Sequence, residues 1–531
     1  MSENNLKETI ENGEVVLGIE LGSTRIKSVL IDKNFEIIAS GNHDWENQYE
    51  NGLWTYSLDE VWNGLRHSYK MLTQDVYDKT GIYLKKVSAI GVSAMMHGYL
   101  VFDEQENLLV PFRTWRNTNT TKAAKELSEL LNFNIPLRWS ISHLYQALLD
   151  EEVHTEQIKY MTTLAGYVHW RLTGEKVLGV GDASGMFPID NDNHQFDNNM
   201  VDLFRSKTTT FNQPWDILEI LPHVLSAGDS AGILTIEGAR LLDESGNLMP
   251  GIPMCPPEGD AGTGMTATNS VAARTGNISA GTSIFAMLVP EKPLMKMYPE
   301  VDVVTTPAGL QTVMIHCNNG TSEIDVWVDL FDDLLNKLNL NISKDKLYSA
   351  IFDAAIVGNS EESGIMLYNY LSGEPITGFK EGRPVLVRTP EGKLDLANLM
   401  KIQIYSTIAS LRIGMDILEN ENIRIDKITG HGGFFKQANV TQRLMAAALN
   451  TPVSMLKTAG EGGAWGISLL ASYMLNKKYN ETLASYLQEH VFSEMEWTEA
   501  VPDQNEVEEF AMFLERYKKG LPIEEATIDH L

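Results

Sequence analysis

The chain has 531 residues, of which 43% are hydrophobic, so it can bury large cores and should divide into two or more globular domains. Its formal charge of −29 argues against nucleic acid as a partner, since binding a polyanion normally requires a basic face. Two cysteines provide no disulfide framework and no metal-ligand spacing, and no apolar run is long enough to span a membrane. Because residues 1–14 are polar and acidic, unlike a signal peptide, we expect a cytoplasmic protein with no membrane partner.

The first informative segment is a strand that turns on a glycine. An apolar run over residues 15–21 is followed by Gly22, Ser23 and Thr24 and then by a second apolar run over residues 28–31. Glu20 and Lys27 flank the turn. A glycine at a hairpin tip reaches backbone angles that other residues avoid, and nearby amides and hydroxyls can donate hydrogen bonds to phosphate oxygens. An ordinary Gly-Ser hairpin is the alternative for this segment taken alone.

Helical and strand patterns then alternate. Residues 57–72 have helical spacing, with Ser57 as N-cap and one apolar face formed by Leu58, Val61, Trp62, Leu65 and Tyr69. Residues 87–93 and 100–103 have the composition of short buried strands. This alternation predicts α/β layering.

A segment rich in proline and glycine, residues 247–262, marks the expected hinge between domains. Asp260 lies at its end, among small residues and upstream of a second glycine turn. A general base that accepts a proton from an attacking hydroxyl would be needed at such a place. The alternative is that Asp260 is the N-cap of the helix that follows, and the two roles are compatible.

The second glycine turn repeats the pattern of the first. Residues 276–280 and 284–288 are strand-like and enclose Gly281, Thr282 and Ser283. Two such tips facing one another would grip a polyphosphate from both sides, so the pair favours nucleotide binding.

The second half also contains α/β patterns. Residues 396–418 have helical periodicity, residues 423–429 are strand-like, and a glycine loop follows that contains Gly430, Gly432 and Gly433. The loop precedes the helical residues 440–450, so it could admit a nucleotide at the N-terminus of that helix. The small residues at 459–466 are explained by close helix packing at least as well as by a ligand. Residues 480–531 are acidic and helix-like.

Together these segments resemble the FGGY carbohydrate kinases over about residues 15–474. The first phosphate loop of the family, usually Asp-x-Gly-Thr-x-x-x-Lys, is similar to residues 20–27, and its Gly-Asp catalytic segment is similar to Gly259-Asp260. Its second phosphate loop corresponds to residues 281–283, its adenosine motif to residues 430–433, and its Tyr-Leu-x-Gly-Glu stretch to residues 370–374.

The resemblance implies an α/β, two-domain fold of the actin, hexokinase and heat-shock ATPase type (ribonuclease H-like), with an interdomain active-site cleft. The expected domains are a sugar-binding domain at 13–258, a nucleotide-binding domain at 259–505 and an acidic segment at 506–531. It implies in-line transfer from ATP to a sugar, with Asp260 as base and Mg²⁺ held by Glu20 and Asp260. The residues implied for ATP are Gly22, Ser23, Thr24, Lys27, Gly281, Thr282, Ser283, Gly430, Gly432 and Gly433.

The sugar-side motifs resemble those of the D-xylulose kinases in this family. Met96-His97-Gly98 is similar to their pocket segment, the loop with Trp115 and Arg116 to their tryptophan loop, and residues 181–185 to their Asp-Ala-Ser-Gly turn. Alone, His97 would more often be a packed core histidine. The resemblance implies a ketopentose substrate contacted by Met96, His97, Trp115, Arg116 and Asp260, with D-xylulose first and L-ribulose or another sugar or polyol as the alternative.

Three departures separate the chain from the family pattern. Glu20 stands where Asp is usual, residues 141–146 replace a signature that contains a lysine, and Ser93-Ala94-Met95-Met96 differs from the usual Gly-Gln-Met. A longer carboxylate can still hold Mg²⁺ directly or through water. A protein that only senses sugar or nucleotide is the alternative of a different class, since fold alone does not fix function. The sequence leaves open whether the protein forms a homodimer.

Overall fold

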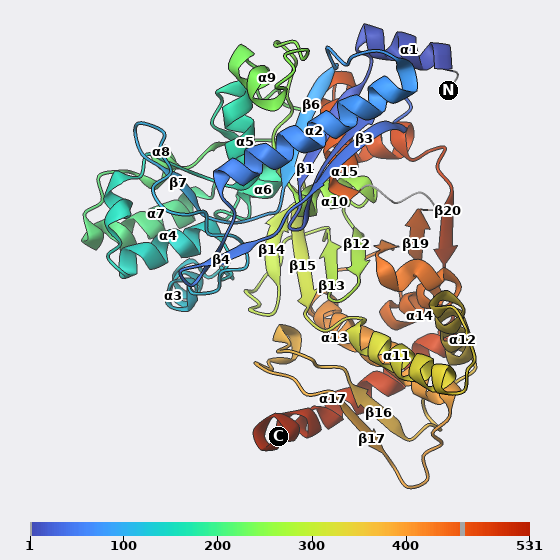
Figure 1. Ribbon diagram of the computed structural model, residues 1–531. Coiled ribbons are helices and arrows are strands. Elements are labelled where there is room, and N and C mark those ends of the chain that lie inside the picture. The colour runs from blue at the N-terminus through green and yellow to red at the C-terminus, as the bar shows by residue number, and fades with distance from the viewer. Residues whose placement is uncertain (1–2, 457–461) are drawn as a thin grey trace. The chain divides into compact units, whose positions relative to one another are not determined.

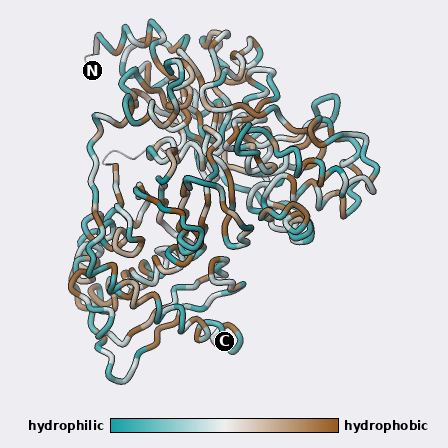
Figure 2. The backbone as a smooth tube through the Cα atoms, turned by 180° about the vertical axis from the view of Figure 1, so that it is seen from behind, coloured by the Kyte–Doolittle hydropathy of each residue, from teal (hydrophilic) through white to brown (hydrophobic). Residues whose placement is uncertain are grey.

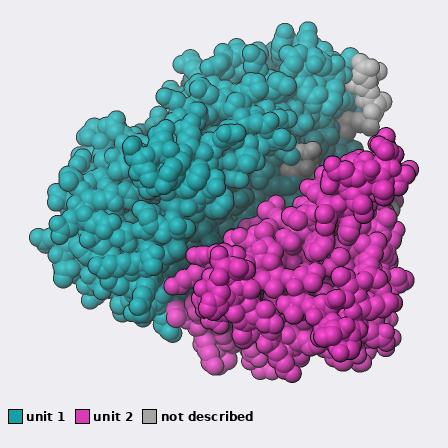
Figure 3. All heavy atoms as spheres, turned by 60° about the horizontal axis from the view of Figure 1, so that its bottom comes forward, with its two compact units in different colours: residues 1–271, 303–312, 459–494 teal, residues 272–302, 313–458, 495–531 magenta. Residues whose placement is uncertain are grey.

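The computed structural model describes residues 3–456 and 462–531, which form two compact units. Of these residues, unit 1 holds 3–271, 303–312 and 462–494, and unit 2 holds 272–302, 313–456 and 495–531 (Figure 3). The proline- and glycine-rich segment 247–262, predicted as a hinge, lies within unit 1.

Unit 1 contains most of the N-terminal elements (Figure 1). Its helices are α1 (Glu3–Asn12), α2 (Leu58–Thr80), α3 (Thr121–Leu131), α4 (Ser140–Leu149), α5 (Leu164–Thr173), α6 (Val180–Ala183), α7 (Asn198–Thr208), α8 (Ile217–Ile220), α9 (Ile236–Leu242), α10 (Asp260–Ala267), α15 (Gly462–Asn476) and α16 (Leu483–Tyr486). Its strands are β1 (Val16–Leu21), β2 (Arg25–Ile31), β3 (Ile37–Asp44), β4 (Gln48–Glu50), β5 (Leu53–Thr55), β6 (Ala89–Ala94), β7 (Leu100–Phe102), β8 (Tyr160–Thr162), β9 (Val177–Gly179), β10 (His223–Leu225), β11 (Glu258–Gly259) and β14 (Asp302–Thr305).

The main sheet of unit 1 has the order β11-β6-β1-β2-β3. Strands β1, β2 and β3 form an antiparallel meander, and β6 and β11 add in parallel. Helices α2 and α15 pack on opposite faces. Gly41 of β3 approaches α2, and a Cβ added at Gly41 would lie 2.1 Å from Ser68 O. Gly18 of β1 approaches α15, and a Cβ added at Gly18 would lie 2.1 Å from Ala464 O. Both faces of this sheet are therefore covered.

Unit 2 holds the remaining elements. Its strands are β12 (Thr275–Ala280), β13 (Ile284–Leu288), β15 (Gln311–Cys317), β16 (Ile365–Tyr368), β17 (Val385–Arg388), β18 (Lys427–His431), β19 (Val453–Leu456) and β20 (Trp497–Ala500). Its helices are α11 (Ser322–Lys337), α12 (Lys344–Ile356), α13 (Leu396–Asn420), α14 (Ala438–Leu449) and α17 (Gln504–His530), with a 3₁₀ turn at Gly433–Gln437.

The sheet of unit 2 repeats the plan of the first. Strands β12, β13 and β15 form an antiparallel meander, and β18 and β19 add in parallel beside β12, as β6 and β11 do beside β1. Each unit has its own hydrophobic core, and the outer helices alternate between hydrophilic and hydrophobic residues along their length (Figure 2). Among the described residues, no helix has the length and apolarity needed to cross a membrane.

Most of the predicted elements are confirmed. Both glycine turns are hairpins, and Ser57 caps α2 by accepting the N–H of Glu60, although that helix continues to Thr80. The strand expected at 423–429 begins only at Lys427. Of the segment 480–531, expected to be helix-like, residues 504–530 form α17, whose Phe510, Phe513 and Tyr517 are buried in the core of unit 2, whereas residues 497–500 form the strand β20.

Candidate active site

The tip of the first hairpin is held through its carbonyl oxygens. The indole N–H of Trp45 donates to Gly22 O at 2.8 Å, and the hydroxyl of Tyr56 donates to Ser23 O at 2.5 Å. In a planar trans peptide the C=O and the following N–H point in opposite directions. The N–H groups of Ser23 and Thr24 therefore point away from these two aromatic residues. The tip presents two main-chain donors, as an anion-binding turn does.

The second hairpin has the same construction with different donors. Thr321 N–H donates to Gly281 O and Gly320 N–H donates to Thr282 O, both at 2.8 Å. By the same peptide geometry, the N–H groups of Thr282 and Ser283 point the other way. A Cβ added at Gly281 would meet no atom within 4 Å, so this tip faces open space.

The glycine loop after β18 lies against the strand that enters the second hairpin. Gly432 has φ +99°, and an added Cβ there would lie 2.5 Å from Ala280 O. A Cβ added at Gly430 would lie 2.4 Å from the Phe435 ring, whereas one added at Gly433 would meet no atom within 4 Å. Two of the three glycines are thus required by packing, and that packing places the loop next to the hairpin.

Asp260 is the first residue of α10. Its Oδ1 accepts a hydrogen bond from Met96 N–H at 3.1 Å. Gly259 is the N-cap and there is no side-chain cap bond, so the alternative that Asp260 is the N-cap is wrong. The residue is exposed, yet the protein around it desolvates the carboxylate and raises its pKa, while the N–H groups of Met96 and Ala261 and the charge of Arg138 lower it. An accessible carboxylate, fixed by the main chain and with a raised pKa, suits a general base.

His97 occupies a buried turn after β6, with φ +69°. Its Nδ1 lies 3.2 Å from Gly185 O, and only a protonated nitrogen can bond a carbonyl oxygen, so Nδ1 carries the hydrogen. Burial, helped by the charge of Arg138, lowers the pKa of His97 to about 3. The ring is therefore neutral and its Nε2 is an acceptor, a group suited to a sugar hydroxyl.

Glu20 lies in β1, opposite Lys27 in the register of the hairpin. Its Oε2 accepts a hydrogen bond from Ala464 N–H at 3.2 Å, in the first turn of α15. A Cβ added at Gly463 would lie 2.2 Å from Glu20 Oε1 and 2.8 Å from the hydroxyl of Thr263 in α10. Helix α15 thus stabilises the Glu20 carboxylate at its N-terminus and brings it next to the helix that begins with Asp260. Packing accounts for Gly463, whereas residues 459–461 of the same small-residue cluster lie outside the described residues.

Trp115 and Arg116 lie in a loop anchored on β5. Asn117 and Trp54 exchange two hydrogen bonds, at 2.8 and 2.9 Å, and the Arg116 guanidinium lies 4.0 Å from the centre of the Trp54 ring. The Trp115 ring remains partly exposed, at 37%. The structure fixes this loop through Trp54 and leaves Trp115 open to solvent.

Three ionisable groups near Asp260 were assigned no role by the sequence analysis. Glu258 accepts the N–H groups of Gly181 and Asp182 at 3.2 and 2.9 Å, which joins β11 to α6. Burial, reinforced by neighbouring carboxylates, raises the pKa values of Asp182 and Glu258 well above their usual range. Arg138, before α4, acts on both His97 and Asp260 through its charge. Asp182 stands in the turn at residues 181–185 and Glu258 in the segment that ends with Asp260, but their burial and the proximity of Arg138 gave no local signal.

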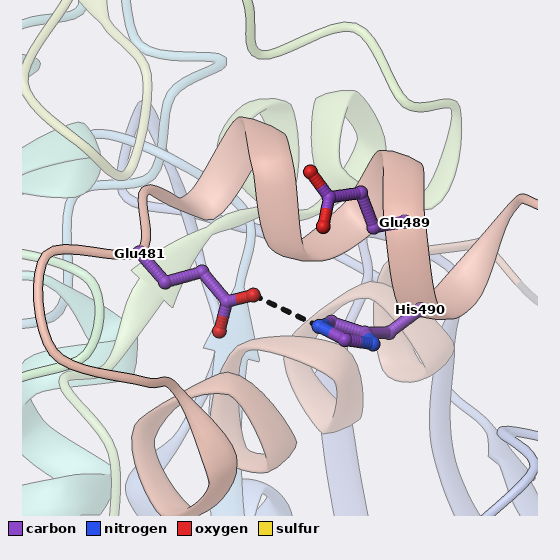
Figure 4. Close-up of side chains that lie close together, drawn as sticks. All are labelled: Glu481, Glu489 and His490. Atoms are coloured by element: carbon purple, nitrogen blue, oxygen red, sulfur yellow. Dashed lines mark hydrogen bonds and ion pairs between the residues drawn. The ribbon is translucent and has the colours of Figure 1, made fainter.

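One group of side chains in the described residues has the spacing of a metal site, and it lies outside these features. Glu481, Glu489 and His490 each offer a ligand atom, all within 4.8 Å of one another (Figure 4). Glu481 Oε1 and His490 Nε2 already form a bonded pair at 2.8 Å. This hydrogen bond accounts for the proximity of two of the three side chains.

The sheet plan, built once in each unit, is that of the actin and hexokinase fold. The chain matches the FGGY family of carbohydrate kinases, its N-terminal domain over residues 15–265 and its C-terminal domain over residues 276–475. It belongs to that family. It is therefore a carbohydrate kinase, which transfers a phosphoryl group to an alcohol group, and the family uses ATP as co-substrate.

Individual relatives are distant. A xylulose kinase from Haemophilus influenzae is 21% identical over 517 residues, which cover 94% of this chain and 98% of that protein. Among solved structures, a xylulose kinase from Lactobacillus acidophilus matches with a TM-score of 0.76 at 18% identity, covering 95% of this chain and 97% of the other. A gluconate kinase from the same organism matches with a TM-score of 0.75, also at 18% identity and with the same coverage. These similarities show a shared fold and leave the sugar undecided.

His143 stands in the segment that replaces the family's lysine signature. It lies in α4, fully buried, and neither ring nitrogen has a hydrogen-bond partner among the described residues. Burial lowers its pKa to about 3. Its ring is therefore neutral and packed against Tyr99, whose ring centre lies 6.2 Å away.

This burial predicts a loss of stability in acid. Because the pKa of His143 is lower in the folded than in the unfolded chain, the unfolded state takes up the proton first as the pH falls below about 6.5. Between pH 7 and pH 5, the free energy of unfolding of the parent should therefore fall by about 2 kcal/mol more than that of the His143→Leu variant. Urea unfolding of both proteins across this pH range measures the difference. The matched change His223→Leu, at an exposed histidine, should leave the pH dependence unaltered, and equal slopes in all three proteins would contradict the prediction.

Proposed function

We propose that the protein is an ATP-dependent kinase of a 2-ketopentose, D-xylulose first, and that Asp260 is its general base. The observation that carries the proposal is the bond from Met96 N–H to Asp260 Oδ1, which ties the carboxylate to the turn that holds His97. Asp260 accepts the proton of a sugar hydroxyl as that oxygen attacks the γ-phosphate of ATP. Burial raises the pKa of Asp260, which makes it a stronger base than an ordinary aspartate.

The two hairpins bind the phosphates of ATP in this proposal. The outward N–H groups of Ser23 and Thr24 in unit 1, and of Thr282 and Ser283 in unit 2, donate to phosphate oxygens, as the tip glycines Gly22 and Gly281 allow. Lys27 adds a positive charge beside the first tip. The adenosine binds at the loop of Gly430, Gly432 and Gly433.

Mg²⁺ accompanies ATP, held by Glu20 and Asp260. The two residues fit such an ion, because Mg²⁺ is usually bound by one or two carboxylates together with substrate phosphates. Both carboxylates are linked to α10, Asp260 as its first residue and Glu20 through the contact at Gly463. When bound, the ion neutralises charge on the phosphate oxygens. Glu20 is held by Ala464 N–H, which orients its carboxylate before any ion is present.

The sugar is bound by the neutral Nε2 of His97, with Met96, Trp115 and Arg116 around it. The xylulose kinases among the relatives support D-xylulose as the sugar. L-ribulose and gluconate are the alternative substrates, gluconate because a gluconate kinase has the same fold. A protein that only senses sugar or nucleotide is the alternative of another class. An accessible carboxylate anchored beside a sugar-facing histidine favours transfer, since a sensor needs no base.

Replacing the base tests catalysis directly. Asp260→Asn should lower turnover by roughly two to four orders of magnitude, the usual range for a positioned general base, and leave ATP affinity nearly unchanged. Coupled ADP release with sugar present, and calorimetry with ATP, measure the two quantities. Asp192→Asn, at an exposed acid of the same unit, is the matched control. Near-normal turnover of the Asp260 variant would rule out Asp260 as the base, and ADP release that no sugar stimulates would favour the sensor.

The second hairpin can be blocked without disturbing the fold. Because Gly281 faces open space and its φ is not in the left-handed region, Gly281→Val should fold normally. Its side chain would stand where phosphate is proposed to meet the N–H groups, so ATP affinity should fall by at least tenfold. Titration calorimetry on the folded variant tests this, and an unchanged affinity would mean that the tip is only a turn.

The histidine tests the sugar assignment. His97→Ala should raise KM or lower kcat/KM for the sugar by on the order of tenfold or more and leave ATP binding intact, because a buried polar partner of a hydroxyl discriminates strongly. His169→Gln, at another buried histidine of unit 1, is the control. A screen of D-xylulose, L-ribulose, glycerol and gluconate should show a ketopentose as the best substrate. A clear preference for a polyol or aldonate would overturn D-xylulose while leaving the kinase assignment in place.

A further inference from the structure

One motif of the sequence has no part in the proposed site: the Tyr-Leu-Ser-Gly-Glu stretch at residues 370–374 of unit 2. It follows β16 and ends in Glu374, the N-cap of a 3₁₀ turn at Pro375–Thr377. Glu374 is 0% exposed although it belongs to a loop, and this burial raises its pKa to about 7. A carboxyl group so far from water requires hydrogen bonds that compensate for the lost solvation. Its partners therefore indicate what the stretch does.

Glu374 is bonded to Asn319, which follows β15. The Glu374 Oε2 accepts the main-chain N–H of Asn319 at 3.3 Å and its side-chain Nδ2 at 3.1 Å. The Asn319 Oδ1 in turn accepts the N–H groups of Leu371 and Ser372 at 2.9 and 3.1 Å, and its Nδ2 donates to Ser372 O at 3.2 Å. An asparagine amide has two N–H groups and two lone pairs, so the stretch engages the whole Asn319 side chain.

The next two residues of the chain hold the tip of the second hairpin. The Gly320 N–H donates to Thr282 O, and the Thr321 N–H donates to Gly281 O, both at 2.8 Å. A Cβ added at Gly320 would lie 2.2 Å from Gly281 O, so only glycine fits at this contact. These are the bonds that turn the N–H groups of the tip outward. Residues 319–321 thus connect the stretch on one side to the hairpin on the other.

The glycine in this connection needs restraint from its neighbours. Glycine has the widest choice of backbone angles of any residue, and a rotation beside Gly320 would turn either N–H away from the carbonyl group that it binds. On one side, Thr321 is the N-cap of α11, which restrains it. On the other side, the restraint comes from the bonds of Asn319 to the stretch. The stretch therefore determines the direction of the Gly320 N–H.

We propose that Glu374 and Asn319 are positioning residues for the ATP of this kinase. Through Gly320 and Thr321 they fix the carbonyl groups of the second tip, and thereby the direction in which the tip presents its N–H groups to phosphate. This role rests on the proposed binding of ATP by the hairpin. Neither residue needs to contact the nucleotide or the sugar, so loss of the pair should weaken ATP binding and leave the sugar site unchanged.

Removing the acceptor tests the role of Glu374. Glu374→Ala leaves two N–H groups of Asn319 without their partner, so ATP affinity should fall by on the order of tenfold and KM for ATP should rise, while KM for the sugar stays unchanged. Glu374→Gln should keep ATP affinity within about twofold of the parent, since its amide oxygen can accept the same two N–H groups. Titration calorimetry with ATP and coupled ADP release measure these quantities.

Glu421→Ala is the matched control for a loss of stability. Glu421 is a buried glutamate of unit 2 that likewise accepts one main-chain N–H, from Met295 at 3.1 Å, and one side-chain donor, the Tyr298 hydroxyl at 2.8 Å. These partners follow β13, at the opposite end of that strand from the tip. Both alanine variants should melt below the parent, but Glu421→Ala should bind ATP normally. Parental ATP affinity in Glu374→Ala, or equal weakening in both variants, would overturn the proposal.

A double-mutant cycle tests whether the pair acts through the hairpin. Asn319→Ala alone should weaken ATP binding as Glu374→Ala does, but it should add little to Gly281→Val, which already blocks the tip. Additive losses would show a route that bypasses the tip and would rule out the proposal. An unchanged ATP affinity in Gly281→Val removes the hairpin from ATP binding, and the positioning role with it. A weakened Gly281→Val beside an unaffected Asn319→Ala refutes the positioning role alone.

Discussion

The arrangement of unit 1 depends on one steric constraint: α15 lies so close to the sheet and to α10 that there is no room for a Cβ atom at three glycines, Gly18, Gly463 and Gly466. A Cβ at Gly18 or Gly466 would lie 2.1 Å from a backbone oxygen, and one at Gly463 would lie 2.2 Å from Glu20. The two backbone contacts cannot be relieved by a rotamer change, so larger residues at Gly18 or Gly466 would have to move the helix, whereas one at Gly463 would displace the Glu20 carboxylate. Because α15 is held there, its first turn donates to Glu20 and its side packs on α10, whose first residue is Asp260. The position of both carboxylates follows from this contact.

The two hairpins achieve the same result by different means. In unit 1 the carbonyl groups of the tip are bound by side chains, Trp45 and Tyr56, whereas in unit 2 they are bound by the main chain at Gly320 and Thr321. Peptide planarity then turns the N–H groups outward in both cases. Any hydrogen-bond donor behind the tip can hold the carbonyl groups. The residues that supply those donors can therefore vary more in type than the residues of the tip itself.

The sugar side is governed by electrostatics in a desolvated environment. Burial keeps His97 neutral, and the charge of Arg138 adds to that effect, whereas burial raises the pKa of Asp260 and the same charge opposes the rise. Xylulose and gluconate kinases share this fold with the chain. In the site proposed above, the choice among acceptors depends on the groups around His97 and Asp260 and on loops such as that of Trp115, since the backbone architecture is common to all of these kinases.

The sequence by itself determined the features that depend on neighbours in the chain: the two hairpins, the capped helix that begins after Ser57, and the small residues around Asp260. Turn and helix preferences act over a few residues, so local patterns are enough to predict them. Tertiary structure alone decided that Met96 N–H, 164 positions away, binds Asp260, and that Ala464 N–H, 444 positions away, binds Glu20. It also decided which nitrogen of His97 is protonated. These properties arise from burial and from the meeting of distant segments, which change solvation and proton affinity without leaving a pattern in the local sequence.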